Sequence, residues 1–265
     1  MSEPIREWVS ELRRATIDTA ERPTILVPFE LFRGESIPPG TFELLAETHV
    51  VLLGYFKVPD QTAPGQASMQ FEERGEQLLE DLSDRFEEAG AVVDSLLCFT
   101  RDPDDSVARI AMDFDCEARL IINQVADVED VLLAVTADLD TETVIGIFGA
   151  MFLQSRPTVH LLDIGKEVSP EAVDRVRRTL VSIGFDDEDI TVRDARARRP
   201  VPRVVEAAAD VDVVVITRQR HGLETYILGD RAKRIAKGYV GPVLVIYEKT
   251  GIDSNGDDTT STPAE

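Results

Sequence analysis

Arginine side chains gather in one short stretch of the chain and are the residues best suited to bind a ligand. Eleven consecutive residues hold Arg193, Arg196, Arg198, Arg199 and Arg203 in an otherwise acidic sequence. A guanidinium group donates paired hydrogen bonds that fit a phosphate or a carboxylate. The cluster therefore indicates either a pocket for a small anionic ligand or a surface lattice in which the arginines pair with the many carboxylates.

A second basic group directly follows the next predicted strand. Loops that follow neighbouring parallel strands converge on the ligand crevice of a doubly wound sheet. The two groups can therefore line one basic crevice. The residues that we predict for it are Thr217, Arg218, Arg220 and His221 from the second group, and Arg196, Arg198 and Arg199 from the cluster.

The remaining chemistry-bearing residues form no catalytic or metal-binding pattern. His49 and His160 enter predicted strands, where a structural role is expected. Cys98 and Cys116 lie in or beside apolar strands without a CxxC spacing, which indicates buried thiols in a reducing compartment. The acidic run 186–189 is expected to be a solvated turn. Because the sequence has no H-E-x-x-H, G-x-S-x-G or Walker pattern, we expect neither catalytic residues nor a metal site.

Composition limits the classes of partner. The formal net charge is −22, from 50 acidic and 28 basic residues, and lysine is scarce. Such a surface suits solubility in high salt and repels phosphate backbones, so we expect a halophilic protein that binds no nucleic acid. No apolar run is long enough to span a bilayer, and the first residues lack the apolar core of a signal peptide. A cytoplasmic protein without membrane insertion is expected.

The chain carries the same order of elements twice. Apolar strands alternate with helical patterns from Thr24 to Asn123, and the order restarts at Asp130 and runs to Glu248. The repeat period of about 105 residues fits two small domains. Alternating helices and continuously apolar strands predict parallel sheets with helices on both faces. The predicted fold class is α/β, with two tandem doubly wound parallel-sheet domains.

The predicted elements follow from this order. Strands are predicted at 24–31, 49–56, 92–99, 118–123, 130–135, 158–165, 190–193, 211–217 and 242–247. Helices are predicted at 41–47, 70–89, from a start at 102–105 through 107–114, and at 141–154, 169–182, 201–209 and 223–239. Residues 59–65 are predicted to be a loop. Ser169 is the expected N-cap of its helix, with Pro170 in the first turn.

The predicted domain boundaries use these elements. Residues 1–22 are expected to hold an amphipathic N-terminal helix with the only tryptophan, Trp8. The first repeat covers residues 23–128 and the second covers 129–249, while 250–265 form a disordered acidic tail. Only the second repeat ends in a glycine-bearing loop, a further helix and a final strand. The first repeat is therefore predicted to be a truncated copy.

The second repeat resembles the universal stress protein family over its whole length. The best match is RQRHGLETYILGDRAKRIAKGYVGPVLV, residues 218–245, which is similar to the family's glycine loop, amphipathic helix and closing strand. HVVLLGYFKVP, residues 49–59, is similar to the family's second strand, so the first repeat resembles a shortened copy. The whole chain resembles a tandem, haloarchaeal member. This resemblance implies a regulator of the stress response.

Many members of this family bind ATP through the pattern G-x2-G-x9-G-[S/T]. Glycines allow backbone N–H groups to approach the phosphate oxygens. The two leading glycines correspond here to Ile216 and Gln219, the third is Gly229, and the Ser/Thr corresponds to Asp230. A carboxylate at that last position repels a phosphate. Gly222 remains from the glycine-rich loop but lies outside the motif, so the pattern disfavours ATP binding of the usual kind.

The family's nucleoside-contacting aspartate also lacks a direct counterpart. Thr136 holds its place in the second repeat, with Asp138 two residues later, and Glu30 holds it in the first. The resemblance therefore adds Thr136, Asp138, Gly222, Gly229 and Asp230 to the predicted ligand-binding residues. No cofactor is established by this pattern, and ATP or another nucleotide stays a candidate ligand.

The predicted function is a non-catalytic tandem regulator that senses a small anionic or nucleotide ligand. Two alternatives stay open: an ATP-binding universal stress protein with slow ATPase activity, and a cytosolic accessory subunit of a membrane transporter, by analogy. The two repeats are expected to contact each other as an internal pseudo-dimer. The final strand has no symmetric mate in the first repeat. Its open edge predicts a homodimer, unless the N-terminal helix or residues 123–132 cover it.

Overall fold

The structure is a computed structural model. It describes residues 22–32, 37–59, 61, 64–124, 127–136, 139–165, 169–194, 199–219 and 230–248. For residues 64–68, 219 and 230 it describes the backbone only. The predicted N-terminal helix and acidic tail lie outside the described residues.

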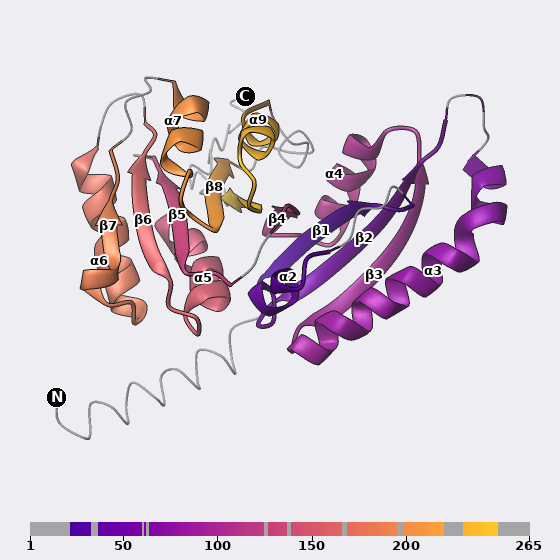
Figure 1. Ribbon diagram of the computed structural model, residues 1–265, viewed down its shortest axis with the longest axis horizontal. Coiled ribbons are helices and arrows are strands. Elements are labelled where there is room, and N and C mark those ends of the chain that lie inside the picture. Colours follow the sequence, from indigo (N-terminus) through magenta and orange to yellow (C-terminus); the bar gives the residue numbers. More distant parts are fainter. Residues whose placement is uncertain are drawn as a thin grey trace, which may run out of the picture.

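The described strands form one nine-stranded sheet, and the predicted α/β class is confirmed (Figure 1). The strands are β1 (Thr24–Glu30), β2 (His49–Lys57), β3 (Val92–Thr100), β4 (Ala118–Ile121), β5 (Asp130–Val135), β6 (Thr158–Asp163), β7 (Ile190–Val192), β8 (Val213–Gln219) and β9 (Val243–Glu248). Their order across the sheet is β3-β2-β1-β4-β9-β8-β5-β6-β7. The strands from β1 to β4 form what we call the first half, and those from β5 to β9 form the second half.

Helices cover both faces of this sheet. They are α2 (Gly40–Leu44), α3 (Pro64–Ala89), α4 (Pro103–Asp113), α5 (Thr141–Phe152), α6 (Pro170–Ile183), α7 (Pro200–Ala207) and α9 (Asp230–Gly238), with a short 3-10 helix η1 (Asp187–Asp189). Buried side chains of α2, α3, α5 and α6 pack in one apolar cluster, and those of α4, α7 and α9 pack in the other. Both clusters contain residues of both halves, so each face of the sheet has a core that the halves share.

Local sequence signals explain where several helices begin. The Ser169 hydroxyl accepts a hydrogen bond from the Ala172 amide at 3.4 Å, and Pro170 occupies the first turn, as predicted. The same helix ends at Gly184, whose φ of 116° is readily adopted only by a residue without a Cβ. Helix α3 begins at Pro64, so the loop predicted at 59–65 is wrong in its last two residues. A proline is well tolerated there, because the first helical amides have no intrahelical partner.

The two halves join along one antiparallel pair of strands. The remaining neighbouring pairs of described strands are parallel, but β4 runs antiparallel to β9, from Ala118 opposite Ile246 to Ile121 opposite Val243. The predicted contact between the halves is therefore present. It makes one continuous sheet instead of two separate sheets.

This pairing corrects the prediction for the final strand. We expected the free edge of β9 to be covered by a second copy, by the N-terminal helix or by residues 123–132. Strand β4 covers it instead, and the facing residues Leu120 and Leu244 are fully buried. The physical reason is that β4 is itself an edge of the first half, since that half has no fifth strand. The unpaired backbone groups of the two edges satisfy each other within one chain.

Candidate functional site

The second half has the strand arrangement that creates a ligand crevice. Strand β5 lies between β6 and β8, so the order of the strands reverses beside it. Strands β5 and β8 run parallel, with Val131 opposite Val213 and Leu133 opposite Val215. Their carboxyl ends, Thr136 on one side and Thr217–Arg218 on the other, therefore lie at the same edge of the sheet. Ligands of open α/β sheets bind at this point.

The structure describes part of the predicted ligand-binding set. Thr136, Thr217 and Arg218 are half-buried at this edge. Arg199 is exposed and stands directly before α7, in the connection that follows β7. The backbone of Asp230 begins α9. The other predicted residues lie outside the described part of the chain: Asp138, Arg196, Arg198, Arg220, His221, Gly222 and Gly229.

One member of the arginine cluster has a structural role. The Arg193 Nη1 atom donates a hydrogen bond to the Ala207 carbonyl oxygen at 2.6 Å and forms an ion pair with the Asp210 carboxylate. Ala207 is the last residue of α7 and Asp210 lies three residues beyond it, so Arg193 connects the end of β7 to the end of this helix. Arg203 lies on α7 and is half-buried, and its Nε atom has no hydrogen-bond partner in the described structure. The surface-lattice interpretation therefore holds for Arg193.

The two described histidines connect neighbouring strands. His49 Nε2 lies 2.9 Å from a carboxylate oxygen of Asp94. His160 lies 2.6 Å from the Asp130 carboxylate through Nε2 and 2.6 Å from the Thr191 hydroxyl through Nδ1. The first residue of β5 supplies this carboxylate, so the array lies away from the carboxyl edge. We interpret both histidines as cross-links between strands, which is a structural role of the kind expected from the sequence.

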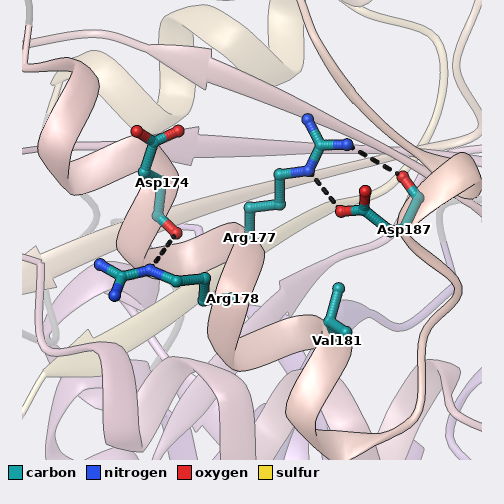
Figure 2. A pocket seen from close by; sticks show the side chains of 5 residues that line it. All are labelled: Asp174, Arg177, Arg178, Val181 and Asp187. Carbon is teal, nitrogen blue, oxygen red and sulfur yellow. Dashed lines mark hydrogen bonds and ion pairs between the residues drawn. The ribbon is translucent and has the colours of Figure 1, made fainter.

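A shallow hollow of about 470 Å³ lies on the outer surface of α6 (Figure 2). Its two arginines bind a carboxylate and a backbone carbonyl oxygen. Arg177 donates from Nε to the Asp187 carboxylate at 2.6 Å, and Arg178 donates to the Asp174 carbonyl oxygen at 3.2 Å (Figure 2). The hydrogen bond from Arg177 lowers the pKa of the Asp187 carboxyl. This hollow is a paired, solvated surface of the kind that the acidic composition predicted, and it lies outside the crevice.

A larger cavity of about 610 Å³ opens at the equivalent point of the first half. Strands β1 and β4 pair only from Ile25–Ala118 to Leu26–Arg119, and the cavity lies beyond that point. Residues of β1, of the end of β4 and of the segment between α9 and β9 line it, so both halves contribute. Arg119 is among the lining residues, and the sequence interpretation missed it. The available signal was a single charged residue inside the otherwise apolar run 118–122.

Two further observations concern cofactors and membranes. Among the described residues, no group of three or more His, Cys, Asp or Glu side chains is placed to hold a metal ion. Within the same residues, no helix combines the length and the apolar character that a membrane span requires.

Comparison with known proteins gives the fold. No family model matches the sequence, and no curated protein is similar to it at the sequence level. A functionally unknown protein from Pseudomonas aeruginosa PAO1 is 18% identical over 88% of this chain and 94% of its own, with a TM-score of 0.51. A universal stress protein from Archaeoglobus fulgidus is 14% identical over 87% of this chain and 97% of its own, with a TM-score of 0.55. The chain thus has the doubly wound α/β fold that universal stress proteins have.

Proposed function

We propose that the chain is a non-catalytic tandem regulator of the universal-stress-protein type, which senses a small anionic or nucleotide ligand in the cytoplasm of a halophile. The observation that carries this proposal is the parallel register of β5 and β8. It brings Thr136 and Arg218 to one carboxyl edge, at the point where the strand order reverses. An arginine at such an edge suits a phosphate or a carboxylate.

The residues beside this edge support the expectation that ATP binds only weakly. Ile216, at the place of a family glycine, is 7% exposed and packs in the cluster under α7 and α9. A branched side chain at this position keeps the backbone away from a phosphate. Asp230, where the family pattern has Ser or Thr, is negatively charged in the sequence. We therefore expect a smaller or less charged anion to bind better than ATP.

The test begins with mass spectrometry of small molecules released from the purified full chain. A recovered anion is then titrated by calorimetry in molar salt, alongside ATP, AMP and phosphate. We expect Arg218→Met to lower the affinity for the recovered anion by about ten- to a hundredfold, as for loss of one charge-assisted contact. Arg177→Met is the matched control, because this arginine lies on the outer surface of α6, outside the crevice.

Three outcomes would replace the proposal. Phosphate release from ATP that Arg218→Met abolishes would support the slow ATPase. A protein that carries and binds no small molecule would support the accessory subunit. Equal affinity of wild type and Arg218→Met for the recovered anion would remove the crevice as its site. A homodimer through β9 is not part of the proposal, because β8 and β4 already occupy both sides of that strand.

A further inference from the structure

Arg119 is a buried arginine in the middle of a sheet. It is 8% exposed, and its neighbours across the strands are Leu26 of β1 and Val245 of β9, which are fully buried. Its Nε and Nη1 atoms are sealed from solvent and have no hydrogen-bond partner in the described structure. A guanidinium stays protonated in proteins, and a buried charge without a partner is costly. The position therefore calls for an anion.

The protein groups around Arg119 supply little compensation. Burial is the largest influence on the guanidinium and lowers its pKa, while Tyr247, Asp104 and Tyr55 act in the opposite direction. The carboxylate of this group, Asp104, accepts a hydrogen bond from Lys233 at 2.5 Å. It is therefore already neutralised by another cation.

The cavity that Arg119 lines has apolar walls. Pro28, Phe29 and Ile37 line it from the first half, and Val240 lines it from the second. The polar Asn123 is engaged, since its Nδ2 atom donates to the Gly241 carbonyl oxygen at 3.0 Å and to the Ala236 carbonyl oxygen at 3.4 Å. These bonds hold the segment before β9 against the end of β4. Among the described lining residues, Arg119 is the only cation.

We propose that this cavity binds a small monocarboxylate with an apolar body. Its carboxylate pairs with Arg119, and its apolar part lies against the proline, phenylalanine and isoleucine walls. One cation matches one negative charge. A nucleoside triphosphate carries several charges, and the net charge of −22 opposes its entry. The site is separate from the crevice between β5 and β8, so the proposed function stands or falls independently of it.

The test uses the full chain in molar salt, with hexanoate and benzoate as probes and hexanamide and benzamide as neutral controls. Calorimetry and thermal melting report binding. We expect the carboxylates to bind and to raise the melting temperature, and the amides to do neither at equal concentration. Arg119→Met should melt higher than wild type without a probe, because an unpaired buried charge is gone. It should bind the carboxylates about ten- to a hundredfold more weakly.

Two further variants keep the test independent of folding. Arg109→Met removes an exposed arginine from the neighbouring α4 and should leave both readouts unchanged. Val240 is 76% exposed, so its replacement leaves the core intact. Val240→Asp should weaken the binding of the carboxylates, because it places a like charge at the cavity wall. Val240→Asn should leave their binding unchanged.

Several results would overturn the proposal. They are the absence of carboxylate binding at millimolar concentration, equal binding of carboxylates and amides, and unchanged carboxylate affinity in Arg119→Met. Displacement of hexanoate by millimolar inorganic phosphate, lost in Arg119→Met, would overturn the monocarboxylate assignment in favour of a phosphate ligand.

Discussion

Lys233 of α9 donates a hydrogen bond to Asp104 of α4, with Nζ and Oδ2 2.5 Å apart. Asp104 belongs to the first half and Lys233 to the second. This ion pair therefore links the halves on the face of the sheet that α4 and α9 cover. The side chains are 44% and 39% exposed, respectively. Solvent therefore screens much of their attraction.

Replacing the lysine should have a small effect on stability. We expect Lys233→Met to lower the free energy of unfolding by no more than about 1 kcal/mol in low salt, as for exposed ion pairs. The difference should shrink further in molar salt. Urea denaturation of both proteins measures it, with Lys57→Met, an exposed lysine of β2, as the control. A loss of several kcal/mol would mean that the contact of α4 with α9 depends on this pair.

A charge in the middle of β9 should unfold the protein instead of changing its oligomeric state. Val245 is 1% exposed and faces Arg119 across the strands. Val245→Lys places a second buried cation beside the first, at a cost of several kcal/mol. Circular dichroism should show a large fall in melting temperature. Val192→Lys, at a 57% exposed position on the edge strand β7, should fold normally. A folded Val245→Lys protein that sediments as half the wild-type mass would restore the dimer through β9.

Loss of a buried carboxylate should loosen the connection after β6. Asp163 is 7% exposed and accepts hydrogen bonds from the amides of Gly165, at 2.8 Å, and Ser169, at 2.5 Å. Asp163→Ala leaves both amides without this partner. We expect it to lower the free energy of unfolding by about 1–3 kcal/mol. Asp174→Ala, at an exposed position of α6, should have a free energy of unfolding within about 0.5 kcal/mol of wild type.

The pair of Arg193 with Asp210 should add stability that depends on pH. The hydrogen bond from Arg193 holds the pKa of the Asp210 carboxyl below its ordinary value of 3.8. Stability from a lowered carboxyl pKa is fully present above the unfolded value and is lost as the pH falls through the folded value. The coupling in a double-mutant cycle of Arg193→Met and Asp210→Asn should therefore be measurable at pH 6 and decline below about pH 4. Because Asp210 is 72% exposed, we expect the coupling free energy to be less than about 1 kcal/mol. A coupling that grows on acidification would contradict this assignment.

The sequence predicts the central strands well because they are buried on both faces. The run 131–135 has no polar side chain that a helix would have to present to solvent, and the predicted bounds 130–135 match β5. The pairing of β4 with β9 could not be predicted in this way. Nothing local in either run encodes the direction or the identity of a neighbour from the other half.

The candidate sites show the same division. From the sequence, Arg218 is grouped with the arginines that follow β7, as if β7 and β8 were neighbours. In the structure β5 and β6 lie between β7 and β8, and the register of β5 with β8 brings Thr136 to the edge of Arg218 instead. The cavity at Arg119 was not predicted, because one of its walls comes from Val240, far away along the chain. An arginine inside an apolar strand indicates a partner, but the sequence does not tell which segments enclose it.

The pairing of Ala118 with Ile246 also has a consequence for how the protein is made. A ribosome releases β4 long before β9, so the nascent first half waits with an open strand edge while the whole second half is synthesised. Open apolar edges associate with other chains. We therefore expect chains that terminate before β9 to aggregate, and the last strand to complete the first half as well as the second.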